Sequence, residues 1–204
     1  MTSRDPRDAI LLQCCPIHPA PVFGSPELLD EPGRRLWACA DGLYLEVRSP
    51  VLHWLLLVAQ VPMPYGRLSP FVRLLNGAIP STLMQDIAQQ SLAASPSEVA
   101  FGIQWTDSGY ELIVPPVLSC DANHVAYRDT FDPARLVLDI HSHGQHAAYF
   151  SPTDDASDSS RIGPYLAAVI GPRYPLADSE LALRAVCAPY LIPLPAEALS
   201  VVVK

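Results

Sequence analysis

An apolar segment that ends in two closely spaced histidines constrains the fold of this chain more than any other feature. Residues 136–140 (LVLDI) predict a buried strand, and His141 and His143 follow it directly. At strand spacing both imidazoles project to the same face, so they can point at one ion. A catalytic zinc site needs three protein ligands and one open position. The two histidines supply two of these ligands.

A serine and an aspartate follow at a spacing that can complete such a site. Ser151, Pro152 and Asp154 also have the pattern of a helix start, with serine as the N-cap and proline at the first helical position. A helix start would hold the Asp154 carboxylate in a fixed place, so the two interpretations are compatible. We therefore predict a zinc site formed by His141, His143 and Asp154, with Ser151 beside it.

A glutamate upstream has the context of a catalytic base. Residues 81–94 (STLMQDIAQQSLAA) predict a helix with Ser81 as its N-cap, because apolar side chains recur at three- and four-residue steps. Residues 95–97 (SPS) end the helix, and residues 98–103 (EVAFGI) open a strand. Glu98 is either an ordinary exposed residue at a strand start or the proton acceptor of the site. Its position directly after the helix break favours the second interpretation.

Together these residues resemble the signature of the JAMM metallopeptidases, also called MPN+ or JAB, over roughly residues 81–180. The resemblance implies a cytidine-deaminase-like fold, in which a curved mixed sheet is flanked by helices. It also implies that the two histidines and Asp154 bind zinc, that Ser151 assists the tetrahedral intermediate and that Glu98 is the general acid and base. The family usually has proline after the second histidine, whereas this chain has Gly144. A glycine there predicts a looser loop but removes no ligand.

A second metal-binding pattern overlaps the same histidines. Residues 141–146 (HSHGQH) also resemble the HxHxDH run of the metallo-β-lactamase fold. That run needs an acidic ligand where this chain has Gln145, and the fold takes further histidines from downstream, where this chain has none after His146. We therefore interpret His146 as a residue at the rim of the site or in solvent. Asp155 and Asp158, on the predicted helix, are interpreted as solvated or as partners of a ligating histidine.

The rest of the pattern predicts two regions with a boundary near residue 80. In residues 1–80, a proline-rich irregular start of 35 residues precedes a hairpin over 36–47 with Asp41-Gly42 at its turn, a strand over 51–61, and a loop with a short helical or turn segment over 62–77. Residues 81–204 form the metallopeptidase-like domain, with strands over 98–105, 110–117, 124–128, 136–140, 165–171 and 181–186 and a second helix over 152–161. Strands with few helices predict an α/β or α+β fold built on a mixed sheet.

Composition excludes several classes of protein. Half of the residues are hydrophobic and 17% are charged, which supports a globular core. The net charge of −8 argues against nucleic acid or an anionic membrane as the principal partner. The longest apolar run, residues 51–61, is too short to span a bilayer. Five cysteines without a CxxC pair favour reduced thiols in the cytoplasm.

Two functions are compatible with the sequence. The N-terminal β-rich region, together with residues 149–155 (YFSPTDD), resembles the PRTRC system protein A family, whose bacterial cassettes include a ubiquitin-like protein and a ThiF-like, E1-related protein. This resemblance implies a zinc-dependent isopeptidase or peptidase that acts on the C-terminal tail or conjugate of a ubiquitin-like protein. The alternative is a non-catalytic scaffold of the MPN type, in which the fold binds other proteins. Scaffold members typically lose metal ligands, and this chain keeps them, so the sequence favours the enzyme.

Overall fold

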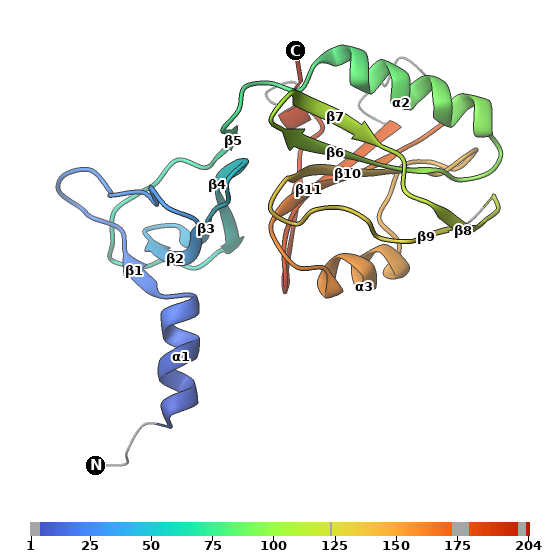
Figure 1. Ribbon diagram of the computed structural model, residues 1–204. Coiled ribbons are helices and arrows are strands. Elements are labelled where there is room, and N and C mark those ends of the chain that lie inside the picture. The colour runs from blue at the N-terminus through green and yellow to red at the C-terminus, as the bar shows by residue number, and fades with distance from the viewer. Residues whose placement is uncertain (1–4, 123, 173–179, 200–202) are drawn as a thin grey trace. The chain divides into compact units, whose positions relative to one another are not determined.

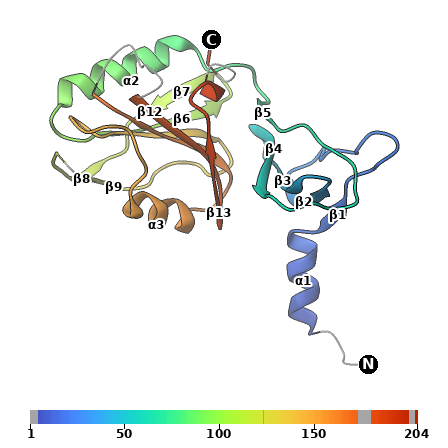
Figure 2. The same ribbon diagram turned by 180° about the vertical axis from the view of Figure 1, so that it is seen from behind.

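The computed structural model describes residues 5–122, 124–172, 180–199 and 203–204. The chain divides into two compact units, Met1–Arg73 and Leu74–Lys204. Figures 1 and 2 draw the elements of each unit from opposite sides. Among the described residues, no helix is long and apolar enough to cross a membrane.

The N-terminal unit is built on a five-stranded sheet with the strand order β1-β2-β3-β4-β5. Its elements are α1 (Pro6–Cys14), β1 (Ile17–Pro19), β2 (Gly33–Cys39), β3 (Gly42–Arg48), β4 (Leu52–Ala59) and β5 (Phe71–Leu74). β2 and β3 form the predicted hairpin, but its turn residues are Ala40 and Asp41 rather than Asp41 and Gly42. Gly42 begins β3, where a Cβ atom would lie 2.5 Å from the carbonyl oxygen of Ala59. The glycine therefore allows a close approach between strands.

The start of the chain is more regular than the sequence predicts. The segment expected to be irregular contains α1, whose N-cap Asp5 accepts a hydrogen bond from the Arg7 backbone N–H at 2.9 Å and whose first position is Pro6. None of the described side chains of α1 is buried. The helix thus lacks the apolar periodicity that would have revealed it. β5 is a second correction, since a short strand was not expected within the loop over 62–77.

A buried carboxylate organises the polar part of the N-terminal unit. Glu46 on β3 is fully buried and accepts hydrogen bonds from the Leu29 backbone N–H at 2.6 Å, Arg35 Nε at 2.7 Å and Trp37 Nε1 at 2.7 Å. Burial acts to raise the pKa of Glu46, but the donors at Trp37, Arg35 and Leu29 hold that pKa below its usual value. The hydrogen bonds therefore offset the cost of burying the negative charge of Glu46.

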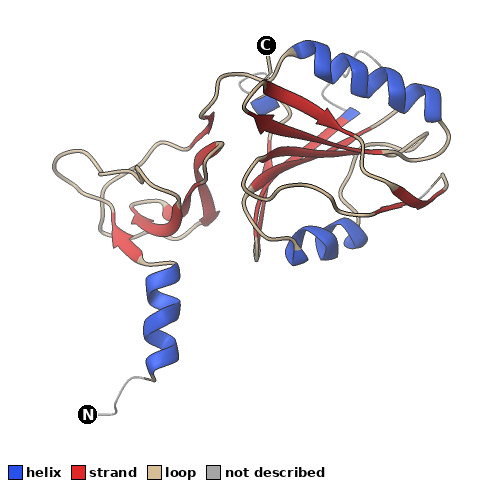
Figure 3. Ribbon diagram, viewed as in Figure 1, coloured by secondary structure: helices blue, strands red, loops and turns tan. Residues whose placement is uncertain are grey.

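The C-terminal unit confirms the predicted α+β fold with a mixed sheet (Figure 3). Its six-stranded sheet has the order β13-β12-β11-β10-β6-β7, and β8 and β9 form a separate two-stranded sheet. The elements are α2 (Ser81–Ala94), β6 (Ala100–Thr106), β7 (Gly109–Ile113), β8 (Val117–Cys120), β9 (Val125–Tyr127), β10 (Leu136–Ser142), α3 (Pro152–Ser160), β11 (Tyr165–Ile170), β12 (Leu181–Cys187) and β13 (Tyr190–Leu194). α2 and α3 lie on opposite faces of the large sheet in both views (Figures 1 and 2).

β10 is the strand that places the site. It pairs in parallel with β11 and antiparallel with β6, so it lies inside the sheet, and its central residues are buried. In the pairing with β6, His141 lies opposite Ala100, which brings the segment before β6 beside the end of β10. Asp139 pairs with Arg161 at the end of α3, and His141 Nε2 lies 3.4 Å from Asp154 Oδ1 near its start. The end of β10, the start of β6 and α3 therefore meet at one place.

Candidate metal centre

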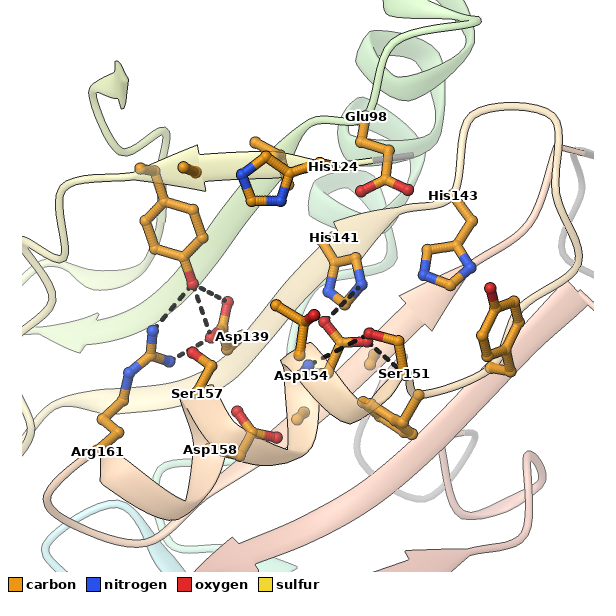
Figure 4. Close-up of a pocket in the computed structure, with 18 of the residues that line it drawn as sticks. Glu98, His124, Asp139, His141, His143, Ser151, Asp154, Ser157, Asp158 and Arg161 are labelled. Carbon is orange, nitrogen blue, oxygen red and sulfur yellow. Dashed lines mark hydrogen bonds and ion pairs between the residues drawn. The ribbon is translucent and has the colours of Figure 1, made fainter. Parts of the chain in front are cut away.

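Three side chains from the end of β10 and the first turn of α3 form a cluster that can hold a metal ion. One ligand atom from each of His141, His143 and Asp154 lies within 4.8 Å of the others. His141 Nε2 and Asp154 Oδ1 are 3.4 Å apart. A tetrahedral zinc with bonds of about 2.0–2.1 Å requires ligand atoms roughly 3.3–3.4 Å apart. Figure 4 shows the three side chains converging, and their number and chemistry fit a zinc site with an open position.

His143 is held in the tautomer that a metal ligand needs. Its Nδ1 lies 3.0 Å from the carbonyl oxygen of Ala147. A carbonyl oxygen only accepts hydrogen bonds, so Nδ1 carries a proton, and the neutral form of the ring has its lone pair on Nε2. The Tyr149 ring packs edge-on against the imidazole, with the ring centroids 4.7 Å apart. These contacts fix the ring orientation as the outer partners of metal-binding histidines do.

His141 is electrically neutral near neutral pH. Burial lowers the pKa of this imidazole from 6.5 to about 4, against the opposing charge of Asp154. A neutral imidazole keeps the lone pair that a metal requires. The imidazole therefore does not need to lose a proton before it binds an ion.

Asp154 and Ser151 form a reciprocal cap at the start of α3. The Ser151 backbone N–H donates to Asp154 Oδ2 at 2.6 Å, and the Asp154 backbone N–H donates to Ser151 Oγ at 3.3 Å. This capping box leaves Asp154 Oδ1 directed at His141. Because Ser151 Oγ accepts in this contact, its own proton is free to be donated. The helix start that the sequence predicts therefore also orients the side chains of Ser151 and Asp154.

Glu98 is brought to the same place from the segment between α2 and β6. The residue is buried, with 6% of its surface exposed, and its backbone N–H donates to the Asp121 carbonyl at 2.8 Å. Figure 4 shows its carboxylate turned toward the two imidazoles. Burial, with smaller contributions from the charges of Asp154 and Asp121, raises the pKa of Glu98 to about 7. A carboxyl group with this pKa can take up and release a proton near neutral pH.

Ser142, between the two histidines, is a positioning residue that the sequence patterns did not single out. Its side chain is buried, and its Oγ accepts a hydrogen bond from the Val99 backbone N–H at 3.1 Å. The Ser142 backbone N–H in turn donates to the Val99 carbonyl at 2.9 Å. Since Val99 directly follows Glu98, the pair fixes the glutamate relative to the histidines. The sequence did contain a signal for this role. Successive residues of a strand point to opposite faces, so Ser142 had to point away from His141 and His143.

The cluster opens into a cavity of about 480 Å³ that extends along α3. Glu98, His141 and His143 line one part, and residues of β9 line another. Away from the cluster, Arg161 pairs with Asp139 and donates to the Tyr127 hydroxyl at 2.9 Å. No local sequence pattern predicted the ion pair of Arg161 and Asp139, because the two residues lie far apart in the chain.

Family models match both parts of the chain. The model described as prokaryotic homologs of the JAB domain matches residues 80–183, just over half of the chain. The chain belongs to the prokaryotic JAB family. A second model, described as a domain of unknown function (DUF2016), matches residues 5–75. A comparison with curated proteins gives no match.

Within the JAB domain, Gly144 lies in a conformation and a close contact that require glycine. Its φ of +51° is a left-handed conformation, and a Cβ atom there would lie 2.1 Å from the carbonyl oxygen of Pro96. The looser loop stays a prediction, and the structure adds a second reason for glycine at this position. Proline, the residue usual in the family, fits neither this φ nor this contact. Since Pro96 lies just before Glu98 and Gly144 just after His143, the close approach joins the segment that holds Glu98 to the segment that holds the two histidines.

Gly144→Ala is expected to lower the free energy of unfolding by about 2–4 kcal/mol, because it adds a steric clash to the cost of a positive φ. The matched control is Gly77→Ala, where φ is +84° and no atom lies within 4 Å of the added Cβ. That variant is expected to lose only about 1–2 kcal/mol. Urea denaturation of both variants measures the difference. Equal losses would show that the approach to Pro96 is not tight.

The acidic residues that follow Asp154 pair with an arginine rather than with His141 or His143. Asp155 and Asp158 both pair with Arg184 on β12, and Asp158 also accepts a hydrogen bond from the Tyr165 hydroxyl at 2.7 Å. The solvated interpretation is confirmed for Asp155, whose side chain is 54% exposed, although it also pairs with Arg184. It is corrected for Asp158, which is buried and is held by Arg184 and the Tyr165 hydroxyl. His146, in contrast, is exposed and lies outside the three-residue cluster.

Proposed function

We propose that this JAB-family protein is a zinc-dependent peptidase or isopeptidase. The observation that supports the proposal best is the convergence of His141, His143 and Asp154 in one cavity with the buried carboxyl group of Glu98. The alternative, a non-catalytic MPN-type scaffold, needs none of these groups. A complete ligand set beside a carboxyl group with a raised pKa therefore favours the enzyme.

His141, His143 and Asp154 would hold the zinc ion. When bound, zinc lowers the pKa of a coordinated water toward about 7 and polarises a carbonyl group. Glu98, with a pKa of about 7, would accept the proton of the attacking water and deliver it to the leaving amine. The Ser151 hydroxyl, whose proton is not used in the capping box, would donate to the developing oxyanion. A single donor of this kind typically contributes about 3–4 kcal/mol to transition-state stabilisation.

The proposed substrate is the C-terminal tail of a ubiquitin-like protein. β9 lines the cavity beside the cluster, so an extended peptide could lie along it and be held through main-chain hydrogen bonds. A tail that ends in small residues would enter such a site most easily. We place this activity in a PRTRC-type bacterial cassette, with a ThiF-like, E1-related protein as a further partner. The chain's net charge of −8 is compatible with a basic tail.

The test is to incubate the zinc-loaded full-length protein with a cassette-encoded ubiquitin-like protein that carries a short C-terminal extension, and to follow its mass. We expect cleavage after the terminal glycine or a comparable small residue. The chelator-treated protein is the control and should leave the substrate intact. Binding without cleavage would favour the scaffold. If ubiquitin-like fusions are neither cut nor bound while unrelated peptides are cut, the substrate proposal fails.

A further inference from the structure

α3 carries Asp154 in its first turn but has almost nothing apolar with which to pack. Its sequence, PTDDASDSS, contains no large hydrophobic side chain. Among its described side chains, Asp158 alone is buried. A helix of 9 residues is not stable by itself, so tertiary contacts must hold it. Polar contacts with the sheet therefore determine where the first turn lies.

Arg161 supplies one contact of this kind at the end of the helix, and Arg184 supplies several nearer its start. The Arg184 side chain lies on β12 and is buried, with 4% of the residue exposed. Its Nε donates to Asp158 Oδ2 at 2.8 Å, and its Nη1 pairs with Asp155 Oδ1. The guanidinium also lies over the Phe150 ring, 3.8 Å from the centroid. A forked guanidinium can make these contacts together, whereas a lysine ammonium cannot.

The partners of Arg184 flank the residues of the proposed site. Phe150 directly precedes Ser151, and Asp155 directly follows Asp154. Asp158 lies one helical turn further and is held by the Tyr165 hydroxyl as well. The guanidinium thus contacts the chain on both sides of the Ser151–Asp154 capping box. Movement of this turn would change the 3.4 Å separation of Asp154 Oδ1 and His141 Nε2.

We propose that Arg184 is the positioning residue that sets the third metal ligand and the Ser151 hydroxyl in place. The role depends on the proposed metal site, but it does not depend on which peptide is cut. Arg184 is not one of the three residues of the metal cluster, and its hydrogen bonds and ion pairs reach Asp154 only through α3. Outer partners of metal ligands typically change metal affinity by about 10- to 100-fold when they are removed.

The experiment compares the full-length parent with Arg184→Met and Arg184→Lys. In Arg184→Met, zinc affinity measured by chelator competition is expected to fall about 10- to 100-fold. In the metal-free protein, amide hydrogen exchange over residues 150–160 is expected to be faster than in the parent, because the helix loses its anchor. Arg184→Lys should be intermediate, and its cobalt-loaded form should show a changed visible spectrum, which reports ligand geometry.

Arg35→Met is the matched control, because it removes a partly buried arginine from a buried carboxylate in the N-terminal unit. It is expected to leave both zinc affinity and exchange over residues 150–160 unchanged. The proposal is overturned if Arg184→Met keeps parental values, or if Arg35→Met weakens zinc binding equally. Should Arg184→Met fail to fold, parental values in Arg184→Lys overturn it. A parent that binds zinc but cuts no peptide refutes the proposed function and leaves this test intact.

Discussion

Replacing His141 and His143 together by alanine is expected to reduce zinc from about one ion per chain to background, because Asp154 alone is an inadequate ligand. The fold should survive. The double variant gives up the hydrogen bond from His143 to the Ala147 carbonyl, and such a bond contributes about 1 kcal/mol. Metal analysis of the purified double variant measures the first expectation, and circular dichroism measures the second. Near-stoichiometric zinc in a folded double variant would contradict the assignment of the site.

His146→Ala is the matched control, since it removes the same side chain from the same cavity but outside the cluster. It should keep its zinc. Stability provides an independent measurement, because an ion that binds only the folded state stabilises it by about 2.7 kcal/mol at about a hundred times Kd. Added zinc should therefore stabilise the parent and His146→Ala, but not the double variant. Loss of zinc from His146→Ala would instead favour the metallo-β-lactamase pattern.

The parts of the site that the sequence revealed are those encoded by local spacing. His141 and His143 share a face because alternate residues of a strand do, and Ser151 with Pro152 marks a helix start. These patterns need no knowledge of the rest of the fold. The structure accordingly places Asp154 beside His141, and α2 spans the predicted residues 81–94. The predicted N-cap is wrong, since Pro80 holds that position and Ser81 is the first helical residue.

The parts that the sequence did not reveal depend on contacts between distant segments. Arg184 meets Asp158 and Asp155 across 26 and 29 residues, and no local pattern marks such a pair. The conformation of Gly144 could not be inferred either, because the carbonyl group that requires a glycine belongs to Pro96. α1 was missed for a different reason. It has capping residues but no buried face, so no apolar periodicity marks it.

Glu98→Gln is expected to retain zinc and lose about 10²- to 10⁴-fold in the rate of peptide hydrolysis, because it removes the proton acceptor but no metal ligand. The amide has nearly the shape of the carboxyl group, so the cavity should be preserved. The measurement is kcat/KM of the zinc-loaded variant on the cleaved tail peptide, alongside its zinc content. Glu111→Gln is the matched control, since it makes the same chemical change on the exposed part of β7. Parental activity in Glu98→Gln would require another base.

The same substitution is expected to stabilise the metal-free protein at alkaline pH. The pKa of Glu98 is about 7 in the folded chain and 4.5 for the unperturbed group, so between these values the folded state holds a proton that the unfolded state has released. Stability of the parent therefore falls as pH rises through this window, and the full loss is present above it. Glutamine does not titrate, so the variant does not lose stability in this way. Urea denaturation in chelator should show Glu98→Gln more stable than the parent by about 1–2 kcal/mol near pH 8, and equal to it below about pH 4.5. A variant less stable than the parent near pH 8 would mean that the carboxylate is favourably solvated there, and Glu98 would then lack the raised pKa that suits it to proton transfer.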